Sequence, residues 1–124
     1  MNFKEFYISD ENGKSNCVIR SLCKILNKEY DVVYNGLCEV AKRINSSSFN
    51  DIPVFEKYME DNDIFKINFD EDVKVKDLKL DGGSYIIFCY DKKDFYHMIS
   101  IVDNIIYDKN FDCMNLYVIS IYKK

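Results

Sequence analysis

Apolar residues recur at helical spacing in the first half of the chain. The run that follows Asn16 has apolar positions at i, i+4, i+7 and i+8, which lie along one face of a helix. Ser15 and Asn16 carry side chains that cap helices, so we predict a helix that begins at or beside Cys17. The apolar face of this helix consists of Val18, Leu22, Ile25 and Leu26.

Two further amphipathic helices are predicted before the pattern changes. Asp31 is the cap candidate of the second helix, which a serine-rich polar run terminates. Asn50 or Asp51 caps the third helix, which tolerates Pro53 in its first turn and ends near Asn62. The expected core positions are Val33, Leu37, Val40, Ala41 and Ile44 in the second helix and Ile52, Phe55 and Met59 in the third.

The second half of the chain changes to the pattern of β-strands. Runs rich in β-branched and aromatic residues, separated by short polar turns, favour an antiparallel sheet. Helices followed by such a sheet define the α+β class. Without a linker or an internal repeat, we predict a single domain that spans residues 1–124. The expected strands are 64–69, 85–90, 95–102, 105–107 and 116–122.

Composition and charge exclude several classes of function. The 124 residues are 48% hydrophobic, with only four glycines and one proline, which is typical of a globular domain with its own core. The net charge is −4, and the lysines are scattered among acidic residues, which argues against nucleic acid as the main partner. No apolar run approaches the roughly 20 residues that span a bilayer, and the start lacks the apolar region of a signal peptide. We therefore expect a cytoplasmic protein without a membrane partner.

The five cysteines are expected to be reduced thiols. Their odd number and irregular spacing do not suit a disulfide framework. The chain has no CxxC pair and a single histidine, so we expect neither a metal site nor another cofactor. Four of the thiols are interpreted as ordinary core or surface residues: Cys23, Cys38, Cys89 and Cys113.

Cys17 stands where a helix would activate its thiol. The positive end of a helix and a nearby imidazolium each lower the pKa of a thiol, and the thiolate is the nucleophilic form. If Asp103 and Asn104 form a two-residue hairpin turn, His97 and Asp108 become diagonal neighbours on one face of the hairpin. A carboxylate there would orient the imidazole and stabilise its cation. Asp103 is the alternative acid, although its place in the turn suits a structural role.

The order of these residues resembles that of the papain-like cysteine peptidases, particularly small bacterial and phage relatives of the leader-cleaving peptidases of bacteriocin exporters. The likeness rests on residues 16–22, where a cysteine opens a helix, and on the His-strand, turn and Asp-strand of residues 97–108. It implies a papain-like fold, with N-terminal helices packed on a C-terminal antiparallel sheet, and a peptidase or amidase acting on a peptide or protein. Cys17 would then be the nucleophile, His97 the general base and acid, and Asp108 the orienting acid.

Two positions depart from the pattern of that family. The family usually places an oxyanion-stabilising side chain, often glutamine, several residues before the cysteine, and this chain contains no glutamine. Asn12 or Asn16 would take this role, together with the backbone N–H of Cys17. Tyr96 stands where a small residue commonly precedes the histidine, and its ring would shade the site or restrict the acyl groups that enter.

Two other functions are compatible with the same sequence. The missing glutamine suits a non-catalytic binding or inhibitor protein of phage or bacterial origin, which would present exposed aromatic residues to a protein partner on the same scaffold. The same thiol would also support acyl transfer or protein crosslinking when an amine replaces water as the acceptor.

Overall fold

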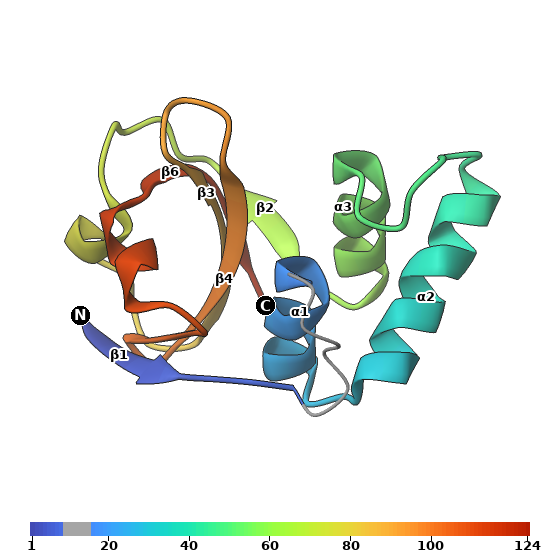
Figure 1. Cartoon of the computed structure of the whole chain (residues 1–124), viewed down its shortest axis with the longest axis horizontal. Coiled ribbons are helices and arrows are strands. Elements are labelled where there is room, and N and C mark those ends of the chain that lie inside the picture. Colours follow the sequence, from blue (N-terminus) through green and yellow to red (C-terminus); the bar gives the residue numbers. More distant parts are fainter. Residues whose placement is uncertain (9–15) are drawn as a thin grey trace.

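Three helices and a six-stranded sheet form the part of the chain that the computed structural model describes, residues 1–8 and 16–124. The helices lie together beside the sheet, with α1 next to it (Figure 1). None of the described helices is long and apolar enough to cross a membrane. The elements are β1 (Asn2–Glu5), α1 (Cys17–Leu26), α2 (Tyr30–Arg43), α3 (Ile52–Asp61), β2 (Phe65–Ile67), η1 (Val75–Asp77), β3 (Ser84–Tyr90), β4 (Tyr96–Val102), β5 (Ile105–Asp108), η2 (Phe111–Asn115) and β6 (Tyr117–Lys123).

The sheet has the strand order β1-β5-β4-β3-β6-β2. All neighbouring strands are antiparallel except β1 and β5, which pair in parallel. The predicted α+β class and the antiparallel C-terminal sheet are confirmed. The expectation that all strands follow the helices is wrong, because β1 precedes them. Its four residues include one apolar side chain, Phe3, which is too weak a signal for a strand.

Helix α1 begins at Cys17 as predicted, but more of its surface is buried than one apolar face. Ile19, Arg20, Ser21 and Cys23 are buried in addition to the expected positions. The reason is that α1 packs against β4, β3 and β5 on one side and against α2 on another. A helix enclosed in this way buries polar side chains too, and these need partners.

The other two helices differ from the prediction at their ends. Helix α2 begins at Tyr30 with Glu29 as its N-cap, so Asp31 lies inside its first turn. Asp51 is the N-cap of α3, as one of the two predicted alternatives. Ile44 and Ile52 were expected in the core and are instead 40% and 48% exposed. Each stands at the end of its helix, where the chain turns away from the core.

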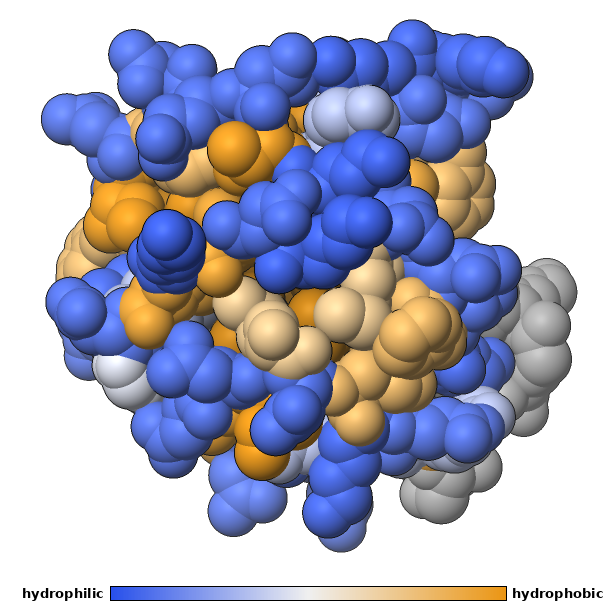
Figure 2. Space-filling view, turned by 90° about the vertical axis from the view of Figure 1, so that its left-hand side faces the viewer, coloured by the Kyte–Doolittle hydropathy of each residue, from blue (hydrophilic) through white to orange (hydrophobic). Residues whose placement is uncertain are grey.

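Side chains alternate across the sheet and separate two apolar clusters. Ile86 and Met98 face the helices and belong to the first cluster. Ile87 and Ile99 point to the opposite face and belong to the second. His97 has the same parity as Ile99, so its side chain starts on the face away from the helices. Figure 2 shows the side of the molecule formed by the sheet half, where apolar side chains lie among hydrophilic ones.

The turn between β4 and β5 has the predicted length and fixes the register of the hairpin. Asp103 and Asn104 have φ angles of 49° and 65°, as a type I′ turn requires. Val102 pairs with Ile105, so the register is the one that brings Asp108 diagonally opposite His97. The Asp103 carboxylate accepts a hydrogen bond from the Gly83 N–H at 2.9 Å, which gives this residue a structural role.

Candidate active site

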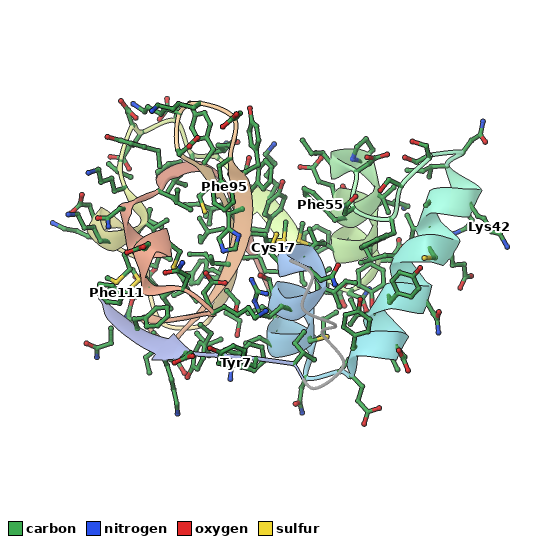
Figure 3. The ribbon with its side chains drawn as sticks, in the orientation of Figure 1. Tyr7, Cys17, Lys42, Phe55, Phe95 and Phe111 are labelled. Carbon is green, nitrogen blue, oxygen red and sulfur yellow. The ribbon has the colours of Figure 1, made fainter. Side chains whose placement is uncertain are left out.

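Helix α1 docks on a stretch of β4 that no strand among the described residues pairs with on that side. The β4–β5 ladder ends at the pair Ser100 and Tyr107, because β5 stops at Asp108. The backbone of Met98 bonds to α1 instead. Its carbonyl accepts a hydrogen bond from Ser21 Oγ at 3.0 Å, and its N–H bonds to the sulfur of Cys17. This contact fixes Cys17 at the start of α1, beside the strand that carries His97 (Figure 3).

The structure brings the three residues expected from the sequence together. His97 Nε2 lies 2.8 Å from Asp108 Oδ2, and the two side chains are 10% and 1% exposed. The half-buried Cys17 shares a hydrogen bond with His97. Since Asp108 occupies Nε2, Nδ1 is the ring nitrogen that remains for the sulfur. The imidazole therefore stands between a thiol and a carboxylate, the order that a nucleophile, a base and an orienting acid require.

Arg20 is a fourth member of the cluster that the sequence analysis missed. Its Nη2 atom lies 3.0 Å from the second carboxylate oxygen, Asp108 Oδ1, and both side chains are almost completely buried. Arg20 and Ser21 follow Cys17 at i+3 and i+4, so all three share the face of α1 that meets β4 and β5. That spacing was the available signal. Polar residues one turn after a nucleophile at a helix start are candidates for its supporting shell.

The surroundings of Cys17 favour its thiolate. Burial raises the pKa of the thiol, but several groups act against this effect. The hydrogen bond and positive charge of His97, the Met98 backbone bond and the charge of Arg20 all lower it, and the net pKa lies below its ordinary value. The position at the N-terminus of α1 acts in the same direction.

The pKa of His97 moves in the opposite direction, which favours the imidazolium. Burial alone lowers it, but the hydrogen bonds and charges of Asp108 and Cys17 raise it from 6.5 to about 9. Burial raises the pKa of Asp108, while His97 and Arg20 hold it below its ordinary value. At neutral pH the cluster therefore contains an imidazolium and a carboxylate that also contacts a guanidinium, beside a thiol whose equilibrium is shifted toward the thiolate.

Two other thiols near this cluster are kept protonated. Burial raises the pKa of Cys89 well above its ordinary value, and its sulfur lies 3.4 Å from the His97 carbonyl oxygen, to which it donates. Burial and the neighbouring Asp108 carboxylate also raise the pKa of Cys113. Neither thiol has the environment of a nucleophile.

The aromatic ring over the imidazole belongs to Phe95 and not to Tyr96. The Phe95 and His97 rings stack with centroids 5.6 Å apart. Tyr96 lies on the opposite face of β4, where it stacks on Phe88 and Tyr90. The expected shading of the site by Tyr96 therefore does not occur, because neighbouring residues of a strand point to opposite faces.

Of the two asparagines proposed as oxyanion donors, the structure describes only Asn16. Asn12 lies outside the described residues. Asn16 is the N-cap of α1, and its backbone carbonyl accepts a hydrogen bond from the Arg20 N–H at 2.9 Å. The Cys17 N–H belongs to the first turn of α1, whose amides have no partner within the helix. This amide is a donor that helix geometry itself places beside the sulfur.

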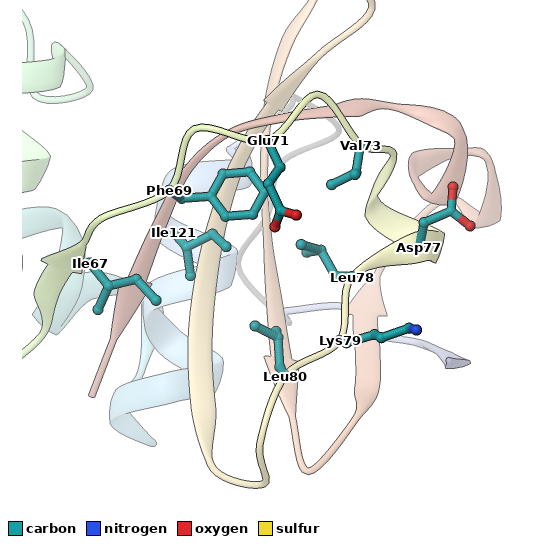
Figure 4. Close-up of a pocket in the computed structure, with 9 residues that line it drawn as sticks. All are labelled: Ile67, Phe69, Glu71, Val73, Asp77, Leu78, Lys79, Leu80 and Ile121. Atoms are coloured by element: carbon teal, nitrogen blue, oxygen red, sulfur yellow. The ribbon is translucent and has the colours of Figure 1, made fainter.

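A cavity of about 370 Å³ lies in the sheet half, apart from the cluster of Cys17, His97 and Asp108 (Figure 4). Cys17, His97 and Asp108 do not contribute to it. The cavity is lined by Ile67, Phe69, Glu71, Val73, Asp77, Leu78, Lys79, Leu80 and Ile121.

Within residues 1–8 and 16–124, no three histidine, cysteine or acidic residues are arranged to hold a metal ion.

Comparison of the chain with protein-family models, with curated proteins and with solved structures found no match.

Proposed function

We propose that the protein is a cysteine hydrolase, a peptidase or amidase that forms an acyl-enzyme at Cys17. The observation that carries the proposal is the hydrogen-bonded chain from Cys17 through His97 to Asp108, with 2.8 Å between imidazole and carboxylate. We further propose that the fold is papain-like, because a cysteine at a helix start is followed along the chain by a histidine and an acid on adjacent strands. All five cysteines are free thiols, which is typical of a cytoplasmic protein. The substrate that we propose is a peptide or a protein.

In the first half of the reaction, the Cys17 thiolate attacks the carbonyl carbon of an amide. The Cys17 N–H stabilises the oxyanion of the tetrahedral intermediate. The imidazolium of His97 then gives its proton to the leaving nitrogen, the C–N bond breaks, and the acyl group remains on sulfur as a thioester.

In the second half, water attacks the thioester and His97 takes one of its protons. The C–S bond breaks, the acid product leaves, and the thiolate and imidazolium are restored. Asp108 holds the ring orientation and stabilises its positive charge throughout.

The pH dependence of hydrolysis is expected to have a basic limb near pH 9. His97 loses its proton as the pH rises through about 9, and the leaving group then has no proton donor. At low pH the rate falls because the Cys17 thiolate becomes protonated. The measurement is kcat/KM across the pH range. A rate that rises through pH 6.5 and stays high above 9 would instead indicate an ordinary neutral imidazole.

Competitive alkylation tests the proposed nucleophile. With limiting iodoacetamide at neutral pH, we expect Cys17 to be labelled on the order of tenfold faster than the other four cysteines. Cys38 is the matched control, since it is the other half-buried thiol and lies away from His97 on α2. The His97→Ala variant is expected to lose the preference. Equal labelling of Cys17 and Cys38 in the wild-type protein contradicts the proposal.

The non-catalytic alternative is favoured by two exposed aromatic residues at the start of β4, one on each face of the strand. Phe95 and Tyr96 are 51% and 54% exposed, as a protein-binding surface would be. If the protein only binds a partner, Cys17→Ala keeps its biological activity and Tyr96→Ala loses it. The hydrolase proposal predicts the reverse for both variants.

A further inference from the structure

A second, smaller cavity opens beside the imidazole. Its volume is about 120 Å³, and His97 and Asp108 are among its lining residues while Cys17 is not. The cavity therefore lies on the histidine side of the site. In the proposed reaction His97 protonates the leaving nitrogen, so the part of the substrate that departs with this nitrogen occupies the histidine side.

The walls of this cavity are mostly apolar. Phe95, Cys113 and Leu116 contribute side chains to it, and the Phe95 ring stacks against the imidazole. At roughly 30 Å³ for one water in the liquid, about 120 Å³ accommodates a branched side chain of about four carbons. The exposed Asn110 and Asp112 form its polar rim, where a carboxylate would repel an acidic group.

Hydrogen bonds hold these walls in place. The Asn110 side chain accepts from the Asp112 N–H at 2.9 Å and caps η2. The Cys113 N–H donates to the Asn110 carbonyl at 3.2 Å, and the Leu116 N–H donates to the Cys113 carbonyl at 3.1 Å. Finally, the Leu116 carbonyl accepts from the Val75 N–H at 2.8 Å. The cavity is thus preformed, as a binding pocket requires.

We infer that this cavity binds the residue on the leaving-group side of the scissile bond and selects a medium-sized apolar side chain there, with leucine favoured over glycine and glutamate. This inference rests on the proposed hydrolase function. Leu116 and Phe95 are the specificity-determining residues, and Asp112 disfavours acidic side chains.

Acyl transfer tests the selectivity directly, because an amine that captures the acyl group occupies the site of the leaving group. The amine nitrogen attacks the thioester carbon, the C–N bond forms and the C–S bond breaks. The amine proton passes to His97, and Cys17 leaves as the thiolate. An N-acylglycine aryl ester acylates Cys17. Leucinamide, glycinamide and glutamic acid amide, each at the same concentration, then compete with water for the acyl group. We expect leucinamide to capture about tenfold more acyl group than either of the others.

Two Leu→Ala variants distinguish an effect of this cavity from the general effect of shortening a half-buried leucine. Leu116→Ala is expected to reduce the preference for leucinamide severalfold. Leu80→Ala, in the larger cavity of Figure 4, removes the same atoms from another half-buried leucine and is expected to leave the preference unchanged. Equal capture of the three amides by the wild-type acyl-enzyme overturns the inference while the proposed function stands.

A binding measurement keeps the two proposals distinguishable. His97 is the only histidine in the chain, so its ring signals in an NMR spectrum are unambiguous. In the Cys17→Ser protein, leucinamide is expected to shift these signals at lower concentration than glycinamide does, and Leu116→Ala is expected to abolish the difference. If the ester forms no acyl-enzyme with the wild-type protein but the shift is seen, the proposed function fails and the cavity still selects leucine. Absence of the shift overturns the inference.

Discussion

Replacement of Asp108 by alanine is expected to lower the free energy of unfolding by about 3–5 kcal/mol. Asp108 and Arg20 are 1% and 2% exposed, so removal of the carboxylate takes a counter-charge away from a buried guanidinium. The imidazole of His97 loses its partner at the same time. Urea denaturation of the wild-type and variant proteins provides the measurement.

Two controls isolate the effect of burial. Arg43 and Asp61 form an ion pair of the same length, 3.0 Å, but both side chains are exposed. Asp61→Ala is expected to cost only a small fraction of the Asp108→Ala loss, because solvent screens an exposed pair. Arg20→Met in the Asp108→Ala background is expected to restore part of the stability, since it removes a buried charge that has lost the Asp108 carboxylate. A small loss for Asp108→Ala, equal to that for Asp61→Ala, would show that the buried pair does not stabilise the fold.

Replacement of His97 by alanine is expected to reduce kcat for amide hydrolysis by about 10²–10⁴-fold, the range that a positioned acid and base contributes. Cys17→Ala is expected to abolish the acyl-enzyme altogether, because no other thiol in the cluster has a lowered pKa. Hydrolysis of an activated amide, with mass spectrometry of the trapped thioester, measures both effects.

Tyr96→Ala is the control for the His97 variant. Tyr96 is the preceding residue on the same strand, but its ring faces the opposite side and stacks on Phe88. We expect this variant to keep wild-type kcat. Denaturation curves of the His97→Ala protein are needed alongside, so that a loss of activity is not mistaken for unfolding. Full activity in His97→Ala would remove the imidazole from the mechanism.

The core of the candidate site was predictable because local rules fix it. The dipeptide of Asp103 and Asn104 specifies a two-residue turn, and the turn sets the register that brings Asp108 to His97. The helix start at Cys17 follows from the apolar spacing after it and the polar residues before it. These signals extend over a few residues, and tertiary packing did not override them.

The parts that sequence analysis missed depend on long-range packing. Arg20 is buried because α1 is enclosed by the sheet and α2. Its i+3 spacing places it on the same face of α1 as Cys17, but this spacing does not show that the face is enclosed. Strand β1 exists because β5 offers it an edge, although its own residues are mostly polar. The small cavity beside His97 is lined in part by η2, a five-residue 3₁₀ helix that the sequence pattern does not indicate.

The proposed chemistry depends most on the charge state of Cys17 and His97, and an NMR titration of the single histidine measures the charge state of His97 directly. In the wild-type protein we predict a midpoint at about pH 9 for the ring signals of His97. In Cys17→Ala the midpoint is predicted to fall toward 6.5, because the thiolate no longer stabilises the imidazolium, while Asp108 keeps it above that value. A wild-type midpoint near 6.5 that Cys17→Ala leaves unchanged would contradict the thiolate–imidazolium pair.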